Sequence, residues 1–207
     1  MKMNRLRLVV FLLAASSFAC LLGQFYGYWT MRAFACWVFP PAGATLAYLA
    51  IKHRGDPLKG PAVWIVQGAI AGVVAAVTYD LYRLPFVLSG APLFKVFPQF
   101  GQLLLGGNGP EWVAQLVGWT YHFSNGAALG IMFLALAHPA RPLLLVLYAA
   151  LFAMGVEVLL LLTPYANFFG LQMNARFLFL TASAHLIFGI ALGLWCQWRI
   201  PRPAAIL

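Results

Sequence analysis

Residues 122–130 read HFSNGAALG and residues 185–193 read HLIFGIALG, so both stretches follow the pattern His-x-x-x-Gly-x-Ala-Leu-Gly. Each stretch lies inside a long apolar segment and places two glycines four residues apart. Glycines at this spacing let membrane helices approach each other closely. Residues four apart share one face of a helix, so each histidine faces the same way as its glycines. The pattern therefore predicts two helices whose histidines point into a bundle and not at lipid.

The composition is that of a membrane protein. Of the 207 residues, 63% are hydrophobic and only 8% are charged, whereas soluble domains carry about 25% charged residues. A water-soluble globule is therefore excluded, and the lipid bilayer is the expected partner. The net charge of +9 does not indicate nucleic-acid binding, because the cations are not gathered into a basic arm or stripe.

Six apolar segments approach the length of about 20 residues that crosses a bilayer. We therefore predict an all-α fold, an integral membrane bundle of six transmembrane helices in a single domain over residues 1–207. Two N-terminal helices within 1–55 precede a four-helix core within 61–198. The predicted spans are residues 8–28, 34–52, 61–84, 111–137, 142–163 and 176–198.

Two segments allow more than one interpretation. The N-terminal stretch is basic, then apolar, and ends in small residues, so it fits a signal peptide as well as an anchor helix; we favour the anchor. Residues 85–110 form a long outer loop that is apolar but broken by Pro and Gly. We expect an interfacial or re-entrant piece there, with a seventh span as the alternative.

The Lys and Arg residues at the span ends predict the orientation, because cytoplasmic loops carry the excess of these cations. One set of ends carries nine and the other carries four, namely Arg32, Arg83, Lys95 and Arg176. The larger set should be cytoplasmic, which places both termini in the cytoplasm. The nine cations are Lys2, Arg5, Arg7, Lys52, Arg54, Lys59, Arg141, Arg199 and Arg202.

The two histidine stretches fall in the fourth and sixth predicted spans, which run in the same direction because one span separates them. An ancestral duplication of a helix pair would explain this likeness, although short apolar matches also arise by chance. A related small-residue pattern, GAIAG at 68–72, lies in the third span. The glycines predicted to pack helices together are Gly68, Gly72, Gly126, Gly130, Gly189 and Gly193.

Two acids and the two histidines fall in the outer half of the predicted bilayer. Asp80, Glu157, His122 and His185 come from four different spans and reach a similar depth. An ionisable side chain inside a span costs ~2.5–3.5 kcal/mol or more, so partners, water or a bound ion must compensate. Local alternatives exist: a lone histidine often bonds a neighbouring helix, and Asp80 can pair with Arg83 three residues on.

A polar stripe descends the fourth span toward His122. Glu111, Gln115, Gly118, His122 and Asn125 follow a helical spacing, and we interpret Glu111, Gln115 and Asn125 as an access route from the outer surface. Glu111 also fits the first turn of the helix, where an acid complements the helix dipole.

Imidazole and carboxylate groups together favour a metal ion or haem as the cofactor. His122 and His185 would be ligands, Glu157 a ligand or proton acceptor, and Asp80 a ligand or the partner that orients one. One alternative is a non-catalytic accessory or assembly subunit that associates with other membrane subunits. Another is a proton-coupled or small-solute permease. Whether the protein is an enzyme stays open.

The stretches HFSNGAALG and AHLIFGIALG resemble transmembrane helices of a group of small bacterial inner-membrane proteins of unknown function. The terminal helix of some members is similar to HLIFGIALGL (185–194). The resemblance covers roughly spans three to six and implies a bacterial inner-membrane protein. It implies no activity and no site residues.

Overall fold

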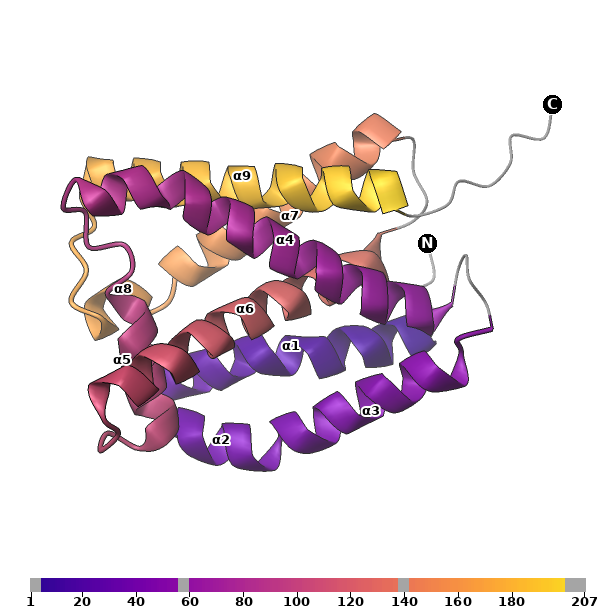
Figure 1. Cartoon of the computed structure of the whole chain (residues 1–207), viewed down its shortest axis with the longest axis horizontal. Coiled ribbons are helices and arrows are strands. Elements are labelled where there is room, and N and C mark those ends of the chain that lie inside the picture. Colours follow the sequence, from indigo (N-terminus) through magenta and orange to yellow (C-terminus); the bar gives the residue numbers. More distant parts are fainter. Residues whose placement is uncertain (1–4, 56–59, 138–141, 200–207) are drawn as a thin grey trace.

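The computed structural model describes residues 5–55, 60–137 and 142–199, and this part of the chain consists of helices joined by turns and loops, without strands (Figure 1). The all-α fold is confirmed. The helices are α1 (Arg5–Phe25), α2 (Met31–Trp37), α3 (Phe39–Lys52), α4 (Pro61–Leu88), α5 (Val96–Leu105), α6 (Glu111–Leu136), α7 (Pro142–Leu161), α8 (Tyr165–Phe168) and α9 (Ala175–Arg199).

The predicted spans correspond to these helices, with two differences. The second span is broken at Val38 into α2 and α3, because Pro40 and Pro41 occupy the first turn of α3, where an amide hydrogen has no acceptor within the helix. The connection between α4 and α6 is shorter than the predicted loop of residues 85–110. Helix α4 continues through Pro85 to Leu88, and α5 is a ten-residue helix inside the loop.

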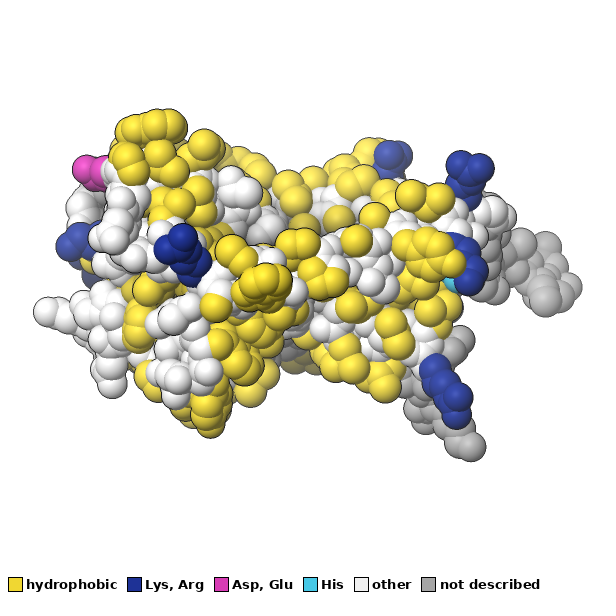
Figure 2. Space-filling view, turned by 90° about the horizontal axis from the view of Figure 1, so that it is seen from below, with side chains coloured by type: hydrophobic (Ala, Val, Ile, Leu, Met, Phe, Trp, Pro, Cys, Tyr) yellow, Lys and Arg dark blue, Asp and Glu magenta, His cyan; other side chains and the backbone are white. Residues whose placement is uncertain are grey.

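Several helices have the length and apolarity that a membrane span requires. Five qualify: α1, α2 with α3, α4, residues 144–161 of α7, and α9. Helix α6 is long enough, at 26 residues, but its polar residues keep it out of this set. Large apolar side chains such as Leu88 and Leu162 are more than three-quarters exposed. Figure 2 shows hydrophobic side chains across the middle of one face and Lys and Arg toward its two ends.

The predicted charge asymmetry corresponds to the two ends of the bundle. Helix α1 begins, and α3 and α9 end, at the same end of the molecule (Figure 1). Five of the nine cations predicted to be cytoplasmic are therefore at this end: Arg5, Arg7, Lys52, Arg54 and Arg199. The remaining four, Lys2, Lys59, Arg141 and Arg202, lie outside the described residues.

Glycines bring α4 and α6 into backbone contact. A Cβ atom on Gly72 would lie 1.9 Å from the carbonyl oxygen of Gly126, and a Cβ on Gly130 would lie 2.0 Å from that of Gly68. No side chain fits between backbones at this distance, which explains the small residues on both helices.

A second glycine contact joins α7 and α9. A Cβ atom on Gly189 would lie 2.6 Å from the Cα of Ala150, and one on Gly193 would lie 2.6 Å from the Cα of Val146. Here the glycines are on α9 alone, and α7 contributes small or β-branched residues. All six glycines predicted to pack helices therefore lie at helix contacts. Helix α4 also packs on α9, which joins the two helix pairs.

Helix α5, in the connection between α4 and α6, covers one side of α6. Helix α5 lies against the first turns of α6, where a Cβ on Gly118 would lie 1.7 Å from the carbonyl oxygen of Phe97. A Cβ on Gly101 would lie 1.8 Å from that of Ala114. This contact covers the middle of the predicted polar stripe on α6.

Candidate functional site

Asp80 of α4 and His122 of α6 form the first ionisable pair. Asp80 Oδ2 lies 2.8 Å from His122 Nε2, and the Asp80 residue is only 8% exposed. An ionised carboxylate only accepts hydrogen bonds, so Nε2 carries the hydrogen and donates it. The other ring nitrogen, Nδ1, then has a lone pair when the imidazole is neutral.

Arg83 supplies a positive charge to this first pair. Its Nη1 lies 3.6 Å from Asp80 Oδ1, and its Nη2 donates a hydrogen bond to the carbonyl oxygen of Leu93. The guanidinium carbon lies 4.7 Å from the ring centre of Tyr79 and 5.1 Å from that of Phe94. Arg83 is therefore buried between aromatic rings, and its charge offsets that of Asp80.

Glu157 of α7 and His185 of α9 form the second pair. Glu157 Oε2 lies 3.1 Å from His185 Nδ1, and the same nitrogen lies 2.9 Å from the carbonyl oxygen of Thr181. A backbone carbonyl accepts only, so Nδ1 carries the hydrogen and Nε2 has the lone pair of a neutral imidazole. Glu157 is 2% exposed, and its Oε1 has no hydrogen-bond partner among the described residues.

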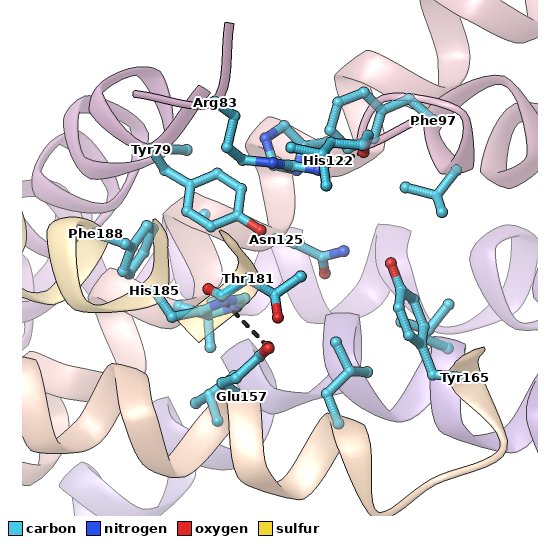
Figure 3. Close-up of a pocket in the computed structure, with 18 of the residues that line it drawn as sticks. Tyr79, Arg83, Phe97, His122, Asn125, Glu157, Tyr165, Thr181, His185 and Phe188 are labelled. Atoms are coloured by element: carbon cyan, nitrogen blue, oxygen red, sulfur yellow. Dashed lines mark hydrogen bonds and ion pairs between the residues drawn. The ribbon is translucent and has the colours of Figure 1, made fainter. Parts of the chain in front are cut away.

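A cavity of about 130 Å³ lies between the two pairs (Figure 3). The ring centre of Tyr79 is 6.1 Å from that of His122 and 5.1 Å from that of His185, so Tyr79 is close to both imidazoles. The polar lining comes from five helices: Tyr79 and Arg83 of α4, His122 and Asn125 of α6, Glu157 of α7, Tyr165 of α8, and Thr181 and His185 of α9. Most of the remaining lining is aliphatic or aromatic, including Phe97, Phe100 and Phe188.

Several polar atoms at this cavity have no hydrogen bond within residues 5–55, 60–137 and 142–199. They are His122 Nδ1, His185 Nε2, Glu157 Oε1, Arg83 Nε and the hydroxyl groups of Tyr79 and Tyr165. Figure 3 shows both tyrosine hydroxyls directed into the space between the labelled side chains. Burial raises the pKa of Tyr165 well above its usual value, so this hydroxyl keeps its proton and can donate.

The charges of the two pairs differ. Arg83 balances Asp80, whereas no Lys or Arg in the described part forms an ion pair with Glu157. With both imidazoles neutral, the cluster therefore carries one net negative charge. A buried charge without compensation is strongly unfavourable, so this state requires a proton or a bound cation.

The four residues predicted to form one site are thus brought together as two pairs that share a cavity. Within the described ranges, no three His, Cys, Asp or Glu side chains lie close enough together to hold a metal ion. Acid and histidine meet on packed neighbouring helices, and this pairing depends on helix contacts that the sequence pattern does not specify. The prediction that His122 and His185 face the bundle interior is confirmed, since both line the cavity.

The predicted access stripe is only partly at the site. Asn125 lines the cavity and accepts a hydrogen bond from Ser17 of α1. Glu111 and Gln115 are exposed on the first turns of α6 and do not line this cavity. The stripe is interrupted where α5 covers Gly118.

Sequence reasoning assigned no role to Tyr79 or Tyr165 and expected Arg83 only in a local ion pair near the membrane surface. Tyr79 and Arg83 are four residues apart, so they share a face of α4 next to Asp80. This spacing is the feature of the sequence that indicates that Tyr79 and Arg83 lie near Asp80. Tyr165 follows α7 in a short helix, and nothing in its local sequence indicates that it reaches the cavity.

Compared with known proteins, the sequence matches no family model, and neither a curated protein nor a solved structure matches it significantly.

Proposed function

We propose that this chain is a multi-pass membrane protein that binds a small ligand in the cavity between its two His–carboxylate pairs. The observation that supports this proposal best is the hydrogen bonding of the two imidazole rings. In each pair a carboxylate engages one ring nitrogen and leaves the other without a partner at the cavity. A carboxylate held in this way fixes the ring orientation and stabilises the imidazole when it accepts a proton.

The cavity size restricts the class of ligand. At about 130 Å³ it is close to the engineered cavity of about 150 Å³ that binds one benzene molecule. A ring-sized molecule therefore fits, whereas a haem, with four pyrrole rings, is too large for this arrangement. For this reason we do not propose haem as the ligand.

A metal ion is the second candidate, because histidine ligands of metals usually donate their other N–H to a carboxylate or a backbone carbonyl. His122 and His185 both have this arrangement. They would be the ligands, with Asp80 and Glu157 orienting them. The described residues offer no third ligand at coordination distance, so a metal ion needs water or a side-chain movement to complete its coordination.

The membrane topology belongs to the same proposal. We propose that α6 crosses the bilayer with the five apolar spans, because it packs along both α1 and α4. Both termini would then lie in the cytoplasm of a bacterium, with the protein in its inner membrane and the cavity in the outer half. A duplicated helix pair would make α4 with α6 equivalent to α7 with α9.

Transport and a purely structural role are less well supported. A permease requires a polar path across the bundle, but the core cluster that contains Ala71, Phe133 and Leu192 is apolar. Gln67 Oε1 and Trp195 Nε1 are the buried side-chain polar atoms of the described residues outside the cavity and its two pairs that lack a hydrogen bond. An accessory subunit that binds other membrane subunits requires no cavity. Absence of any bound species would favour that role.

The test uses the protein purified in detergent. Calorimetric titration with benzyl alcohol measures occupancy of a ring-sized cavity, and elemental analysis after incubation with Zn²⁺ measures metal binding. We expect saturable binding of benzyl alcohol, weakened in Leu160→Phe, which enlarges a side chain that lines the cavity.

For the metal candidate, His122→Ala and His185→Ala should each abolish stoichiometric Zn²⁺. Retention of the ion by both variants would exclude these histidines as ligands. If neither benzyl alcohol nor Zn²⁺ binds to the wild-type protein, the proposed function is wrong.

A further inference from the structure

Glu157 has an acceptor that the protein does not satisfy. The residue is 2% exposed, and its Oε1 finds no donor among the described residues. Buried polar atoms in native proteins are almost always paired with protein, water or a ligand. Because Glu157 lines the cavity and points into it (Figure 3), the missing donor is expected from the cavity side.

The other free atoms near Glu157 also favour a donor. His185 Nε2 has a lone pair when the ring is neutral, because Nδ1 donates toward Thr181 and Glu157. Two neighbouring acceptors therefore face one space. A molecule with several N–H or O–H groups would satisfy both of them.

The charge of the cluster distinguishes between a neutral and a cationic donor. Asp80 is balanced by Arg83 at 3.6 Å, which leaves Glu157 uncompensated when His185 is neutral. In an interior of low dielectric constant this single excess charge attracts a cation strongly. A neutral alcohol would satisfy the hydrogen bonds and leave the charge unbalanced.

The walls of the cavity fit the apolar part of such a cation. Tyr79, Phe97, Phe188 and Tyr165 contribute aromatic rings, and an apolar ring packs favourably against such side chains. The volume of about 130 Å³ accommodates a group about the size of benzene.

We propose that the ligand of this cavity is a small organic ammonium ion with a ring-sized apolar group. The ammonium group donates to Glu157 Oε1 and His185 Nε2, and the apolar group contacts the aromatic wall. This inference rests on the proposed function, because it requires the cavity to be a ligand site.

Two probes of similar size test the proposal by calorimetric titration: benzylammonium, which is cationic, and benzyl alcohol, which is neutral. We expect benzylammonium to bind the wild-type protein about tenfold or more tightly than it binds Glu157→Gln. Benzyl alcohol should bind both proteins equally. Glu111→Gln is the matched control, because it removes an exposed acid outside the cavity, and it should leave both affinities unchanged.

The outcomes separate this inference from the proposed function. Equal binding of the two probes, unaffected by Glu157→Gln, would overturn the ammonium proposal and leave the cavity as a site for neutral ligands. Failure of benzylammonium alone would also overturn it. If Glu157→Gln does not fold, the wild-type protein still decides, because benzylammonium that binds it no more tightly than benzyl alcohol contradicts the proposal.

Discussion

The helix pairs α4–α6 and α7–α9 share one plan. In each pair the first helix carries an acid in its C-terminal half, and the second carries a histidine that meets this acid. In each pair, glycines one and two turns after the histidine bring the helices together. The acid also follows the contact with the first of these glycines at a similar interval, since Asp80 is eight residues after Gly72, and Glu157 is seven residues after Ala150 and eight after Ala149.

The pairs differ in how their charges are balanced. Arg83 supplies a cation to Asp80 and is enclosed by Tyr79, Phe94 and Phe97. Glu157 has only His185, and one of its oxygens is unpaired. Asp80 Oδ1 and Glu157 Oε1 both lack a hydrogen bond within the described residues. The comparison therefore teaches that the pairs differ in charge compensation: Asp80 has a cation beside it, whereas Glu157 has none.

The largest expected effect comes from the glycine contacts. Gly72→Leu places a side chain where a Cβ would already lie 1.9 Å from a backbone oxygen, so we expect loss of the folded protein. Gly189→Leu meets the α7 backbone at 2.6 Å and should also be damaging, but less so. Gly155→Ala is the control, because nothing lies within 4 Å of its Cβ position, and it should gain up to about 1 kcal/mol. Size-exclusion chromatography and circular dichroism in detergent measure these effects, and a normal elution profile for Gly72→Leu would contradict the packing.

Removal of Arg83 should be the next most damaging change. Arg83→Met leaves Asp80 buried beside a neutral imidazole, and loss of one partner of a buried ion pair typically costs about 3–5 kcal/mol. Adding Asp80→Asn to this variant should recover part of the loss, because the uncompensated charge is then gone. Thermal unfolding followed by circular dichroism tests both variants. Equal stability of Arg83→Met and wild type would show that Asp80 does not depend on this cation.

Glu157→Gln should not cause a loss of stability like that of Arg83→Met. It removes an acid that has no cation within the described structure, so we expect stability to change by less than about 1 kcal/mol or to rise. Sites kept for function are often unfavourable for folding, and their removal then stabilises. The same thermal assay measures this effect. A destabilisation as large as that of Arg83→Met would mean that Glu157 is a structural ion-pair partner, and the contrast between the two pairs would fail.

The smallest effects on stability and binding should come from substitutions in the first turns of α6. Glu111→Gln and Gln115→Ala alter exposed side chains away from the cavity, so stability should change by no more than about 0.5 kcal/mol. Binding of benzyl alcohol should stay the same. A marked loss of binding in either variant would restore the access route that the helical spacing predicts.

Local pattern was sufficient to predict the helices and the direction of the histidines, because apolar length and a four-residue glycine spacing determine both. His122 and His185 face inward for the reason that the spacing gives. The pattern could not specify which acid meets which histidine, since that depends on α4 packing on α6 and α7 on α9. It also could not place Arg83 inside the bundle, because its burial depends on contacts with Leu93, Phe94 and Phe97 in the segment that follows α4. Tyr165 reaches the cavity only through the turn after α7.

Double-mutant cycles between the acids and the histidines test most directly whether there are two separate pairs. Coupling free energies are measured for Asp80 with His122 and Glu157 with His185, and for the crossed combinations Asp80 with His185 and Glu157 with His122. Groups in contact couple by about 0.5–3 kcal/mol, whereas distant groups add within about 0.3–0.5 kcal/mol. We predict coupling within each pair and near-additivity across the pairs. Strong coupling in the crossed combinations, as a single centre that binds all four residues would produce, would contradict the account.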